Sequence, residues 1–473
     1  MNLSNFFSKL KHMQIKYLCL LILLSSFMDS FVTAQVSPAT GGAFEFSQSA
    51  ACLSENDRTA LKHKLTAQVR KMEKDGKLYK SLSSSIVSLE SPIRKAATQS
   101  NQHFYTIRNY VDHDPSATGS QFGSSNLDYN CGVRTYDNTA GYNHRGTDYC
   151  SWPFPWHAYE NDLMEVVAAA AGQIIGIDDN NKDDNCDCIN NFDSWNAIYI
   201  RHADGSVAWY GHLKKGIEKV VGQMVQQGEY LGVVGSSGCS TDPHLHFEVY
   251  DAAGNLIDPY EGSCNSMNNQ TWWAAQEDYY VPRINALRTH FQPPEFGCPA
   301  VNEATHFSDC FHPGDRIYVA MYLRDQLDGS TTDLSVRRPD GTVQYAWTHT
   351  SPQYYSFSYW YWYIDLPLNV ASGEWTVEAV YQGVTSDYSF EYTSQACSCQ
   401  PEYAQNGGSR LSGGLSFARD YQAAGVINSK QSISTTSTAV EVIYDAGESI
   451  TLLPEFEVSS GVVFSALIGG CVL

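Results

Sequence analysis

The chain has 473 residues, of which 43% are hydrophobic and 17% are charged. This composition is ordinary for a globular protein, and the length predicts about three domains. The formal net charge of −21 disfavours nucleic acid as a partner, because nucleic acid attracts basic surfaces, so we expect no nucleic-acid binding.

The first 34 residues have the pattern of a secretory signal peptide. Lysines precede an apolar run over residues 17–27, and Ala34 ends a stretch of small residues suited to cleavage. Cleavage there would leave 27 basic and 50 acidic residues (30 − 3 and 51 − 1), a net charge of −23. We therefore expect a secreted protein, periplasmic, cell-surface or extracellular, with no transmembrane segment after signal cleavage.

The cysteines predict disulfide bonds. Thirteen are present, and removal of Cys19 with the leader leaves an even number, as is usual for an exported chain. Zinc binding by cysteines is the weaker alternative, because the chain contains no C-x-x-C pair. The pairing that we favour is Cys298 with Cys310, which would enclose a short loop, although sequence alone does not fix the connectivity.

A helix is predicted near the start of residues 35–110. Ser54 is a suitable N-cap, Asp57 follows three positions later, and Gly76 stands beyond the expected end. The apolar residues between them fall on one helical face. We assign residues 35–110 to an N-terminal helical segment, with the remainder, over residues 81–100, as helix or linker. Three roles are possible for this segment: a pro-segment that is removed, a latch over the site, or a permanent domain.

Strands and tight turns dominate residues 111–265. The pattern over residues 196–210 predicts a hairpin, which would place His212 at the end of a strand. Alternation of polar and apolar residues over residues 244–250 puts His244 and His246 on one face of a strand.

Two further β units are predicted after this region. Alternating short strands over residues 282–395 predict a β-sandwich of immunoglobulin or fibronectin type. Its aromatic run, residues 354–363, either stacks on glycans or, as we favour, alternates between the two faces of a strand. Short β-prone stretches recur after residue 397, among them Asp445-Ala-Gly-Glu-Ser-Ile-Thr-Leu-Leu-Pro454 and Phe464-Ser-Ala-Leu-Ile468. With these stretches, residues 397–473 resemble a small β-stack module found at the ends of secreted bacterial proteins.

Three short motifs carry the chemistry. They are His144-x-x-x-Asp148, Gly211-His212-Leu213 and His244-Leu245-His246. Histidine and carboxylate side chains in such a group predict a zinc hydrolase site, which needs three protein ligands and an open position for water.

These motifs, in this order and spacing, resemble the lysostaphin-type (LytM-like) zinc endopeptidases over about residues 128–260. Two longer segments belong to the same match: Tyr210-Gly-His-Leu213 and Ser240-Thr-Asp-Pro-His-Leu-His-Phe-Glu-Val249. The resemblance implies an antiparallel β-sheet catalytic domain with one zinc ion. It implies three ligands, His144, Asp148 and His246, and two catalytic histidines, His212 and His244. One departure is Asp242, where the family usually has glycine.

An acidic loop, residues 178–188, offers oxygen ligands that are compatible with calcium. The glycine and the distal glutamate of an EF-hand are missing, however. We favour a solvated loop tied by disulfides, placed between two strands as a wall of the substrate groove.

The sequence therefore predicts a mainly β, secreted zinc metalloendopeptidase of the peptidoglycan-hydrolase type. Its partner would be peptidoglycan stem or cross-link peptides, with a glycan contact through the accessory domain. The alternatives are a catalytically silent cell-wall-binding or regulatory protein, a surface adhesin that acts through the aromatic sandwich, and an endopeptidase for extracellular glycine-rich proteins.

Overall fold

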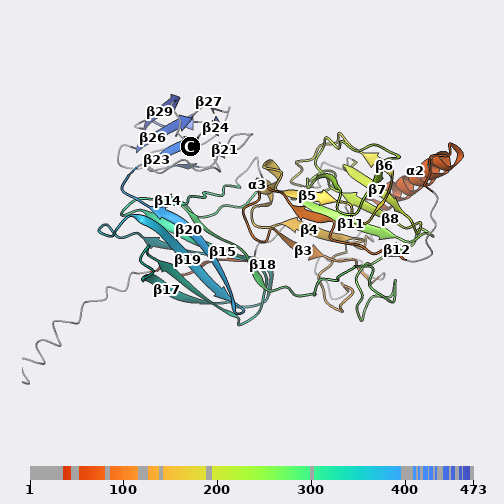
Figure 1. Cartoon of the computed structure of the whole chain (residues 1–473), viewed down its shortest axis with the longest axis horizontal. Helices are drawn as coiled ribbons and strands as arrows, with labels where there is room; N and C mark the ends of the chain where they lie inside the picture. The colour runs from red at the N-terminus through yellow and green to blue at the C-terminus, as the bar shows by residue number, and fades with distance from the viewer. Residues whose placement is uncertain are drawn as a thin grey trace, which may run out of the picture.

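The computed structural model describes residues 36–43, 53–79, 86–114, 126–137, 142–187, 194–298, 303–395 and the strands between 409 and 468. The predicted signal peptide lies outside these residues. The fold is mainly β and is built chiefly from antiparallel sheets, which confirms the predicted fold class. Figure 1 shows two β units side by side, with the C-terminal strands next to one of them.

No helix in the described part of the chain is both long and apolar enough to cross a membrane.

The first unit is organised around an antiparallel sheet with the strand order β3-β4-β11-β8-β7-β6-β9, and β12 pairs with β11. The predicted hairpin is present, and its turn leads into the strand that ends just before His212. The strands are β3 (Tyr105–Asn109), β4 (Thr147–Ser151), β6 (Gly172–Asp178), β7 (Ala197–His202), β8 (Val207–Gly211), β9 (Met224–Val225), β11 (His244–Tyr250) and β12 (Leu256–Ile257).

The two faces of this sheet have different roles. Leu245 and Phe247 of β11 point into a core shared with Ile198 and Tyr210. A smaller sheet, β10-β5-β2, packs residues into the same core. Its strands are β2 (Ile93–Lys95), β5 (Met164–Val167) and β10 (Tyr230–Val233), and the helix α3 (Pro155–Glu160) precedes β5. The opposite face carries His244 and His246, since successive side chains of a strand alternate between the faces.

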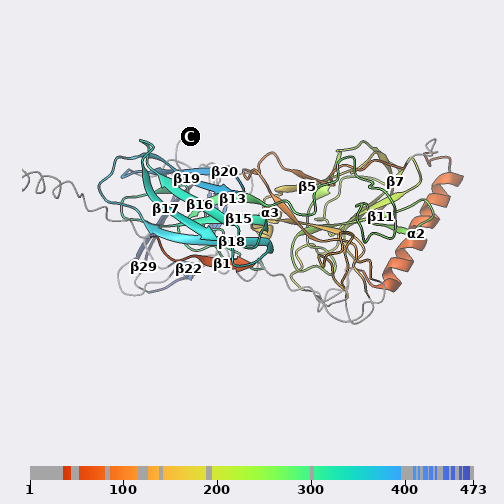
Figure 2. The ribbon, with the colours of Figure 1, turned by 90° about the horizontal axis from the view of Figure 1, so that it is seen from below.

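Helix α2 (Glu55–Lys74) covers part of that opposite face. Its N-cap is Ser54, whose Oγ accepts a hydrogen bond from the backbone N–H of Asp57 at 3.1 Å. Leu61 and Leu65 are buried in a cluster with aromatic side chains of the sheet. Figure 2 shows α2 lying along the outer side of this unit. The predicted helix and its cap are thus confirmed.

The N-terminal segment is only partly helical, which corrects one expectation. The sequence predicts helix or linker over residues 81–100. Within residues 86–100 the structure has the strand β2 and no helix, so the helix alternative is wrong for these residues. A further strand, β1 (Thr40–Ala43), pairs with β18 of the second unit.

The second unit consists of two facing sheets with a common apolar core. One sheet has the order β1-β18-β15-β13, and the other has β14-β20-β19-β16-β17. Their bounds are β13 (Arg283–His290), β14 (Cys310–Phe311), β15 (Arg316–Gln326), β16 (Thr331–Arg337), β17 (Val343–Thr350), β18 (Tyr355–Asp365), β19 (Gly373–Tyr381) and β20 (Val384–Tyr392).

The aromatic run alternates along β18. Trp360 and Trp362 belong to the core between the sheets, whereas Tyr359 and Tyr361 lie on the other face. That other face packs against Trp152 of the first unit, whose ring Nε1 donates to the carbonyl of Leu323 at 3.1 Å. Most of the run is therefore used for packing within and between the two units.

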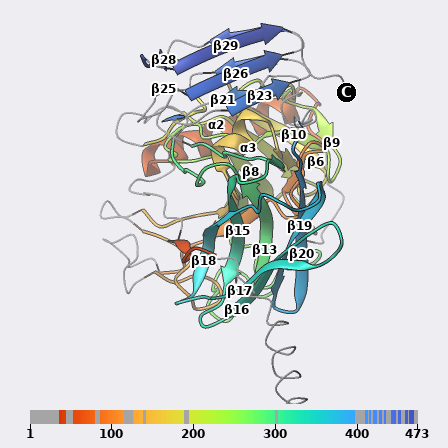
Figure 3. The same ribbon diagram turned by 90° about the vertical axis from the view of Figure 1, so that its left-hand side faces the viewer.

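The C-terminal strands form three parallel ladders, β21-β24-β27, β22-β25-β28 and β23-β26-β29. Figure 3 shows the strands of one ladder, β23, β26 and β29, stacked in this order. Ile450 and Phe464 of this module pack against the core of the second unit. The strands are β21 (Ser409–Leu411), β22 (Gly414–Leu415), β23 (Arg419–Ala423), β24 (Val426–Ser429), β25 (Ser432–Ile433), β26 (Val440–Ala446), β27 (Ser449–Leu452), β28 (Glu457–Val458) and β29 (Val462–Ile468).

Candidate metal centre

Three neighbouring strands bring the five predicted residues together. Asp148 of β4 and His246 of β11 are partners in the strand register, so their side chains stand next to each other on one face. His246 is also the register partner of Gly211, the last residue of β8, and His212 follows it. His144 comes from the loop just before β4.

His144, Asp148 and His246 form a compact group of potential metal ligands. One ligand atom from each lies within 4.8 Å of the other two, and all three side chains are fully buried. Asp148 Oδ2 is 3.1 Å from His144 Nε2, and Asp148 Oδ1 is 2.8 Å from His246 Nδ1. Among the described residues this is the one group of three or more His, Cys, Asp or Glu side chains close enough to hold an ion.

Hydrogen bonds on the far side of each ring orient the two histidines. His144 Nδ1 lies 2.7 Å from the carbonyl oxygen of Tyr110, and His246 Nε2 lies 2.8 Å from Glu248 Oε1. In each case the ring nitrogen that faces the oxygen is the donor, which leaves the other nitrogen with its lone pair directed at the group. Such outer contacts are typical of metal-binding histidines.

Asp148 is ionised in this environment. Burial by itself would raise its pKa, but electrostatic interactions with His144 and His244 and the hydrogen bonds to His144 and His246 hold the pKa well below the ordinary value. The amide Nδ2 of Asn109 also donates to Asp148 Oδ2 at 2.8 Å. A buried anion between imidazoles is the charge arrangement that a divalent cation needs.

His212 and His244 lie beside this group. Their ring centroids are 4.6 Å apart, and His244 Nε2 is 3.8 Å from Asp148 Oδ1. Each ring places Nδ1 against a backbone carbonyl, of Ser237 for His212 at 2.6 Å and of Asp242 for His244 at 2.8 Å. The backbone of His212 has a left-handed φ of 61°, a conformation that is uncommon outside glycine and is often found at functional sites.

Residues other than these five complete the surroundings, and none of them was assigned a role in the site from the sequence. Glu248 contacts His246, and Arg108 pairs with Asp242 at 2.7 Å. For Glu248 a signal was available, because it lies two residues from His246 on the same face of the strand. For Arg108 no local pattern indicates a partner that is 134 positions away.

The acidic loop lies between β6 and β7, as expected, and two of its carboxylates are hydrogen-bonded to backbone. Asp179 accepts from the N–H groups of Gly216 and Ile217, and Asp183 accepts from that of Lys215 at 2.7 Å. Within the described part of this loop, residues 178–187, the acidic side chains form no metal-binding group. The calcium alternative therefore has no structural support.

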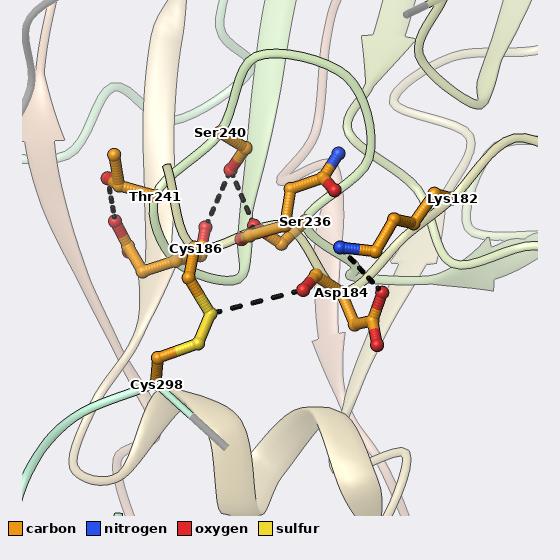
Figure 4. Close-up of a disulfide and its surroundings, with 9 residues drawn as sticks. Lys182, Asp184, Cys186, Ser236, Ser240, Thr241 and Cys298 are labelled. Atoms are coloured by element: carbon orange, nitrogen blue, oxygen red, sulfur yellow. Dashed lines mark hydrogen bonds and ion pairs between the residues drawn. A yellow bond between two sulfur atoms is a disulfide. The ribbon is translucent and has the colours of Figure 1, made fainter. Parts of the chain in front are cut away.

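A disulfide joins this loop to the segment after β13, as Figure 4 shows. Cys298 pairs with Cys186 across a Cα–Cα distance of 5.8 Å, so the predicted pairing of Cys298 with Cys310 is wrong. Closeness in the sequence suggested the short loop, but in the fold Cys298 is bonded to Cys186. A second disulfide joins Cys131 to Cys264.

The disulfide-bound loop supports the turn that orients His212. The carbonyl of Asn185 accepts from Ser236 Oγ at 2.7 Å, and the backbone N–H of Asn185 donates to the carbonyl of Ser236 at 3.0 Å. Ser236 also bonds Ser240 Oγ at 2.8 Å, a contact drawn in Figure 4. The carbonyl that faces His212 belongs to the next residue, Ser237.

The part of the chain that contains all five residues matches a known protein family. The model of peptidase family M23 aligns with residues 144–259. Residues 144–259 are an M23 peptidase domain. The predicted resemblance to lysostaphin-type peptidases is thereby confirmed for this domain, and the family is one of metallopeptidases.

Curated relatives match a short stretch of the M23 domain. The cell division protein DipM of Caulobacter vibrioides is 46% identical over 54 residues, 11% of this chain and 9% of DipM. The peptidoglycan DD-endopeptidase ShyC of Vibrio cholerae is 42% identical over 53 residues, 11% of this chain and 12% of ShyC. The DD-carboxypeptidase/endopeptidase Mpg of Neisseria meningitidis is 49% identical over 54 residues, with the same coverage as ShyC. The chain thus aligns with about a tenth of each relative.

Solved structures of M23 peptidases are among the structural neighbours. The catalytic domain of lysostaphin from Staphylococcus simulans is 28% identical, with a TM-score of 0.19, and the alignment covers 25% of this chain and 77% of that domain. A zinc-containing peptidase from Vibrio cholerae is 18% identical, with a TM-score of 0.22, covering 40% of this chain and 41% of the other.

Proposed function

We propose that this chain is an exported zinc endopeptidase that hydrolyses peptide bonds in the stem or cross-link peptides of peptidoglycan. The observation that carries the proposal is the buried group of His144, Asp148 and His246 inside an M23 peptidase domain. The names of ShyC and Mpg, both endopeptidases, support this reaction, and the name of ShyC supports peptidoglycan as the substrate.

We assign one zinc ion per catalytic domain to His144, Asp148 and His246. Two imidazoles and one carboxylate are a frequent ligand set of catalytic zinc, and each ring has a nitrogen left for a ligand after its outer hydrogen bond. Zinc in such a site supplies a Lewis acid, which lowers the pKa of water to about 7 and polarises a carbonyl.

His212 and His244 move protons in this proposal. Because Nδ1 of each ring donates to a backbone carbonyl, Nε2 is the nitrogen that takes a proton from the attacking water and later donates one to the leaving amine. The 4.6 Å between the rings lets both act at one peptide bond. Either histidine can also stabilise the oxyanion.

The proposal is tested by mass analysis of the products from purified cell walls of different cross-link chemistry, with and without a chelator. We expect peptide fragments that disappear on chelation and are absent with His246→Ala, which would also fail to retain zinc. Undiminished hydrolysis by the chelated or substituted protein would contradict the proposal.

A catalytically silent wall-binding or regulatory protein is the second candidate. The presence of all five residues in one group disfavours it. Bound zinc without hydrolysis of any wall type would favour it, whereas cleavage of a soluble glycine-rich protein would identify a different substrate class.

The domain bounds and the roles of the regions outside the M23 domain are also part of this proposal. We propose that residues 111–265 are the catalytic domain, residues 282–395 an accessory sandwich and residues 397–473 a C-terminal module. A glycan contact through the sandwich would have to use the outer end of the aromatic run, where Tyr363 is 38% exposed, because the other rings of the run are less exposed. The position outside the cytoplasm is likewise a proposal.

A further inference from the structure

We infer that helix α2 is a permanent part of the metal centre, in which Arg58 acts as a positioning residue for His246 through Glu248. This inference rests on the proposed function, since it takes His246 as a metal ligand. It goes beyond that function because Arg58 lies outside the M23 domain, 86 positions before its first residue (144 − 58).

The contact between helix and sheet is a buried ion pair. Arg58 Nη1 lies 2.5 Å from Glu248 Oε2 and 2.8 Å from the hydroxyl of Tyr250. The side chains of Arg58 and Glu248 are 1% and 0% exposed. The guanidinium also lies over the ring of Trp209, 5.8 Å from its centroid. A cation enclosed in this way has one fixed position.

Glu248 connects this cation to the predicted ligand. Its Oε2 accepts from Arg58 and from the hydroxyl of Tyr250, while its Oε1 accepts from His246 Nε2 at 2.8 Å. The two oxygens therefore accept hydrogen bonds from different partners, and the carboxylate cannot rotate without breaking one of these bonds. Because His246 Nδ1 faces Asp148 on the other side of the ring, the orientation of Glu248 sets the direction of that nitrogen.

Packing holds the helix in the position that this chain of contacts requires. Leu61 and Leu65 of α2 are buried with Tyr199 and Trp209, which stand on the same face of the sheet as His246. Removal of α2 as a pro-segment would expose this apolar surface to water and take the guanidinium away from Glu248. Loss of the partner of a buried charge is strongly unfavourable. A latch that must leave for activity is therefore a poor description of α2.

The experiment compares three variants of the full chain. Arg58→Met removes the charge at similar length. Arg58→Met combined with Glu248→Gln removes both charges, so that the fold is kept if the single variant fails to fold. Leu65→Ala is the matched control, because it loosens the packing of α2 without touching Glu248. Unfolding by urea of the metal-free proteins shows how much each change affects the fold.

The decisive readout is zinc affinity, measured by competition with a chromophoric chelator at constant pH. Both Arg58 variants are expected to bind Zn²⁺ about 10- to 100-fold more weakly than the natural chain, the usual effect of changing an outer contact of a metal ligand. Leu65→Ala is expected to unfold at lower urea concentration but to bind Zn²⁺ with unchanged affinity. The absorption bands of bound Co²⁺ should shift in the Arg58 variants alone.

Unchanged zinc affinity and unchanged Co²⁺ bands in the double variant would overturn the inference. An equal loss of affinity in Leu65→Ala would also overturn it, because the helix would then act through packing alone. Failure of the proposed function is a separate result: the natural chain would bind zinc but hydrolyse no peptide, and the affinity comparison would still decide the role of Arg58.

Discussion

Arg108 and Asp242 form a buried ion pair beside the candidate metal centre. Arg108 Nη1 lies 2.7 Å from Asp242 Oδ1, and the two side chains are 9% and 0% exposed. The carbonyl of the same aspartate faces His244 Nδ1. Asp242, which departs from the usual glycine of the lysostaphin-type pattern, is thus matched by a cation from β3 and fixes the turn before the two histidines of β11.

Asp242→Gly is expected to destabilise the protein, although it restores the residue usual in the family. Arg108 would be left as a buried charge without its partner, at a cost of about 3–5 kcal/mol. Urea unfolding measures the effect. Arg108→Met combined with Asp242→Gly should recover most of the loss, and an Asp242→Gly protein as stable as the natural chain would contradict the prediction.

His212→Asn is expected to keep the metal and lose hydrolysis. Asparagine tolerates the left-handed backbone found at this position, so the substitution removes the imidazole with little strain. If His212 transfers protons, the rate falls by about 100- to 10,000-fold. Metal content and product formation are measured on the same sample, and full activity in this variant would exclude His212 from the reaction.

Chelation is expected to lower the thermal stability of the natural chain. An ion that binds only the folded state stabilises it by mass action, by about 2.7 kcal/mol when free metal exceeds the dissociation constant 100-fold. The unfolding temperature should therefore fall with chelator and return with added zinc. His246→Ala serves as the control, and a response of this variant equal to that of the natural chain would mean that the ion binds elsewhere.

Acid is expected to weaken the second unit through His290. Burial lowers the pKa of His290 to about 3, with smaller opposing and reinforcing contributions from the carbonyl of Thr305 and from His306 and Arg288. The unfolded chain, with a pKa of about 6.5, then binds more protons. Stability is complete above that value and is lost as pH falls from about 6.5 towards 3, by at most about 1.4 kcal/mol per pH unit.

Urea unfolding between pH 7 and pH 5 tests this dependence. His290→Gln, which cannot titrate, should show a smaller loss of stability than the natural chain over the same range. Equal pH dependence of the two proteins would show that His290 does not contribute.

Local patterns were sufficient to single out the five residues that the structure brings together and to predict α2. A two-residue period places His244 and His246 on one face of β11, and a capped apolar stripe defines the helix from Glu55 to Lys74. These features depend on neighbours within a few positions, so the sequence contains the information directly.

Contacts between distant segments could not be predicted in this way. Arg58 meets Glu248 across 190 positions, and Cys186 meets Cys298 across 112. No periodicity encodes such pairs, because they depend on how the sheets are placed once folded. The wrong choice of Cys310 as the partner of Cys298 followed from giving weight to closeness in the chain.

The pairing of β1 with β18 joins two strands that are synthesised far apart in time. Thr40 lies opposite Tyr361, so the edge strand of the second unit is made 321 residues before its partner (361 − 40). At a synthesis rate of about 5–20 residues per second, this interval lasts about 16 to 64 seconds. During that time residues 40–43 have no strand to join, while α2 and the sheet beneath it are being completed. β1 can therefore add to the edge of the second unit only after β18 has been made.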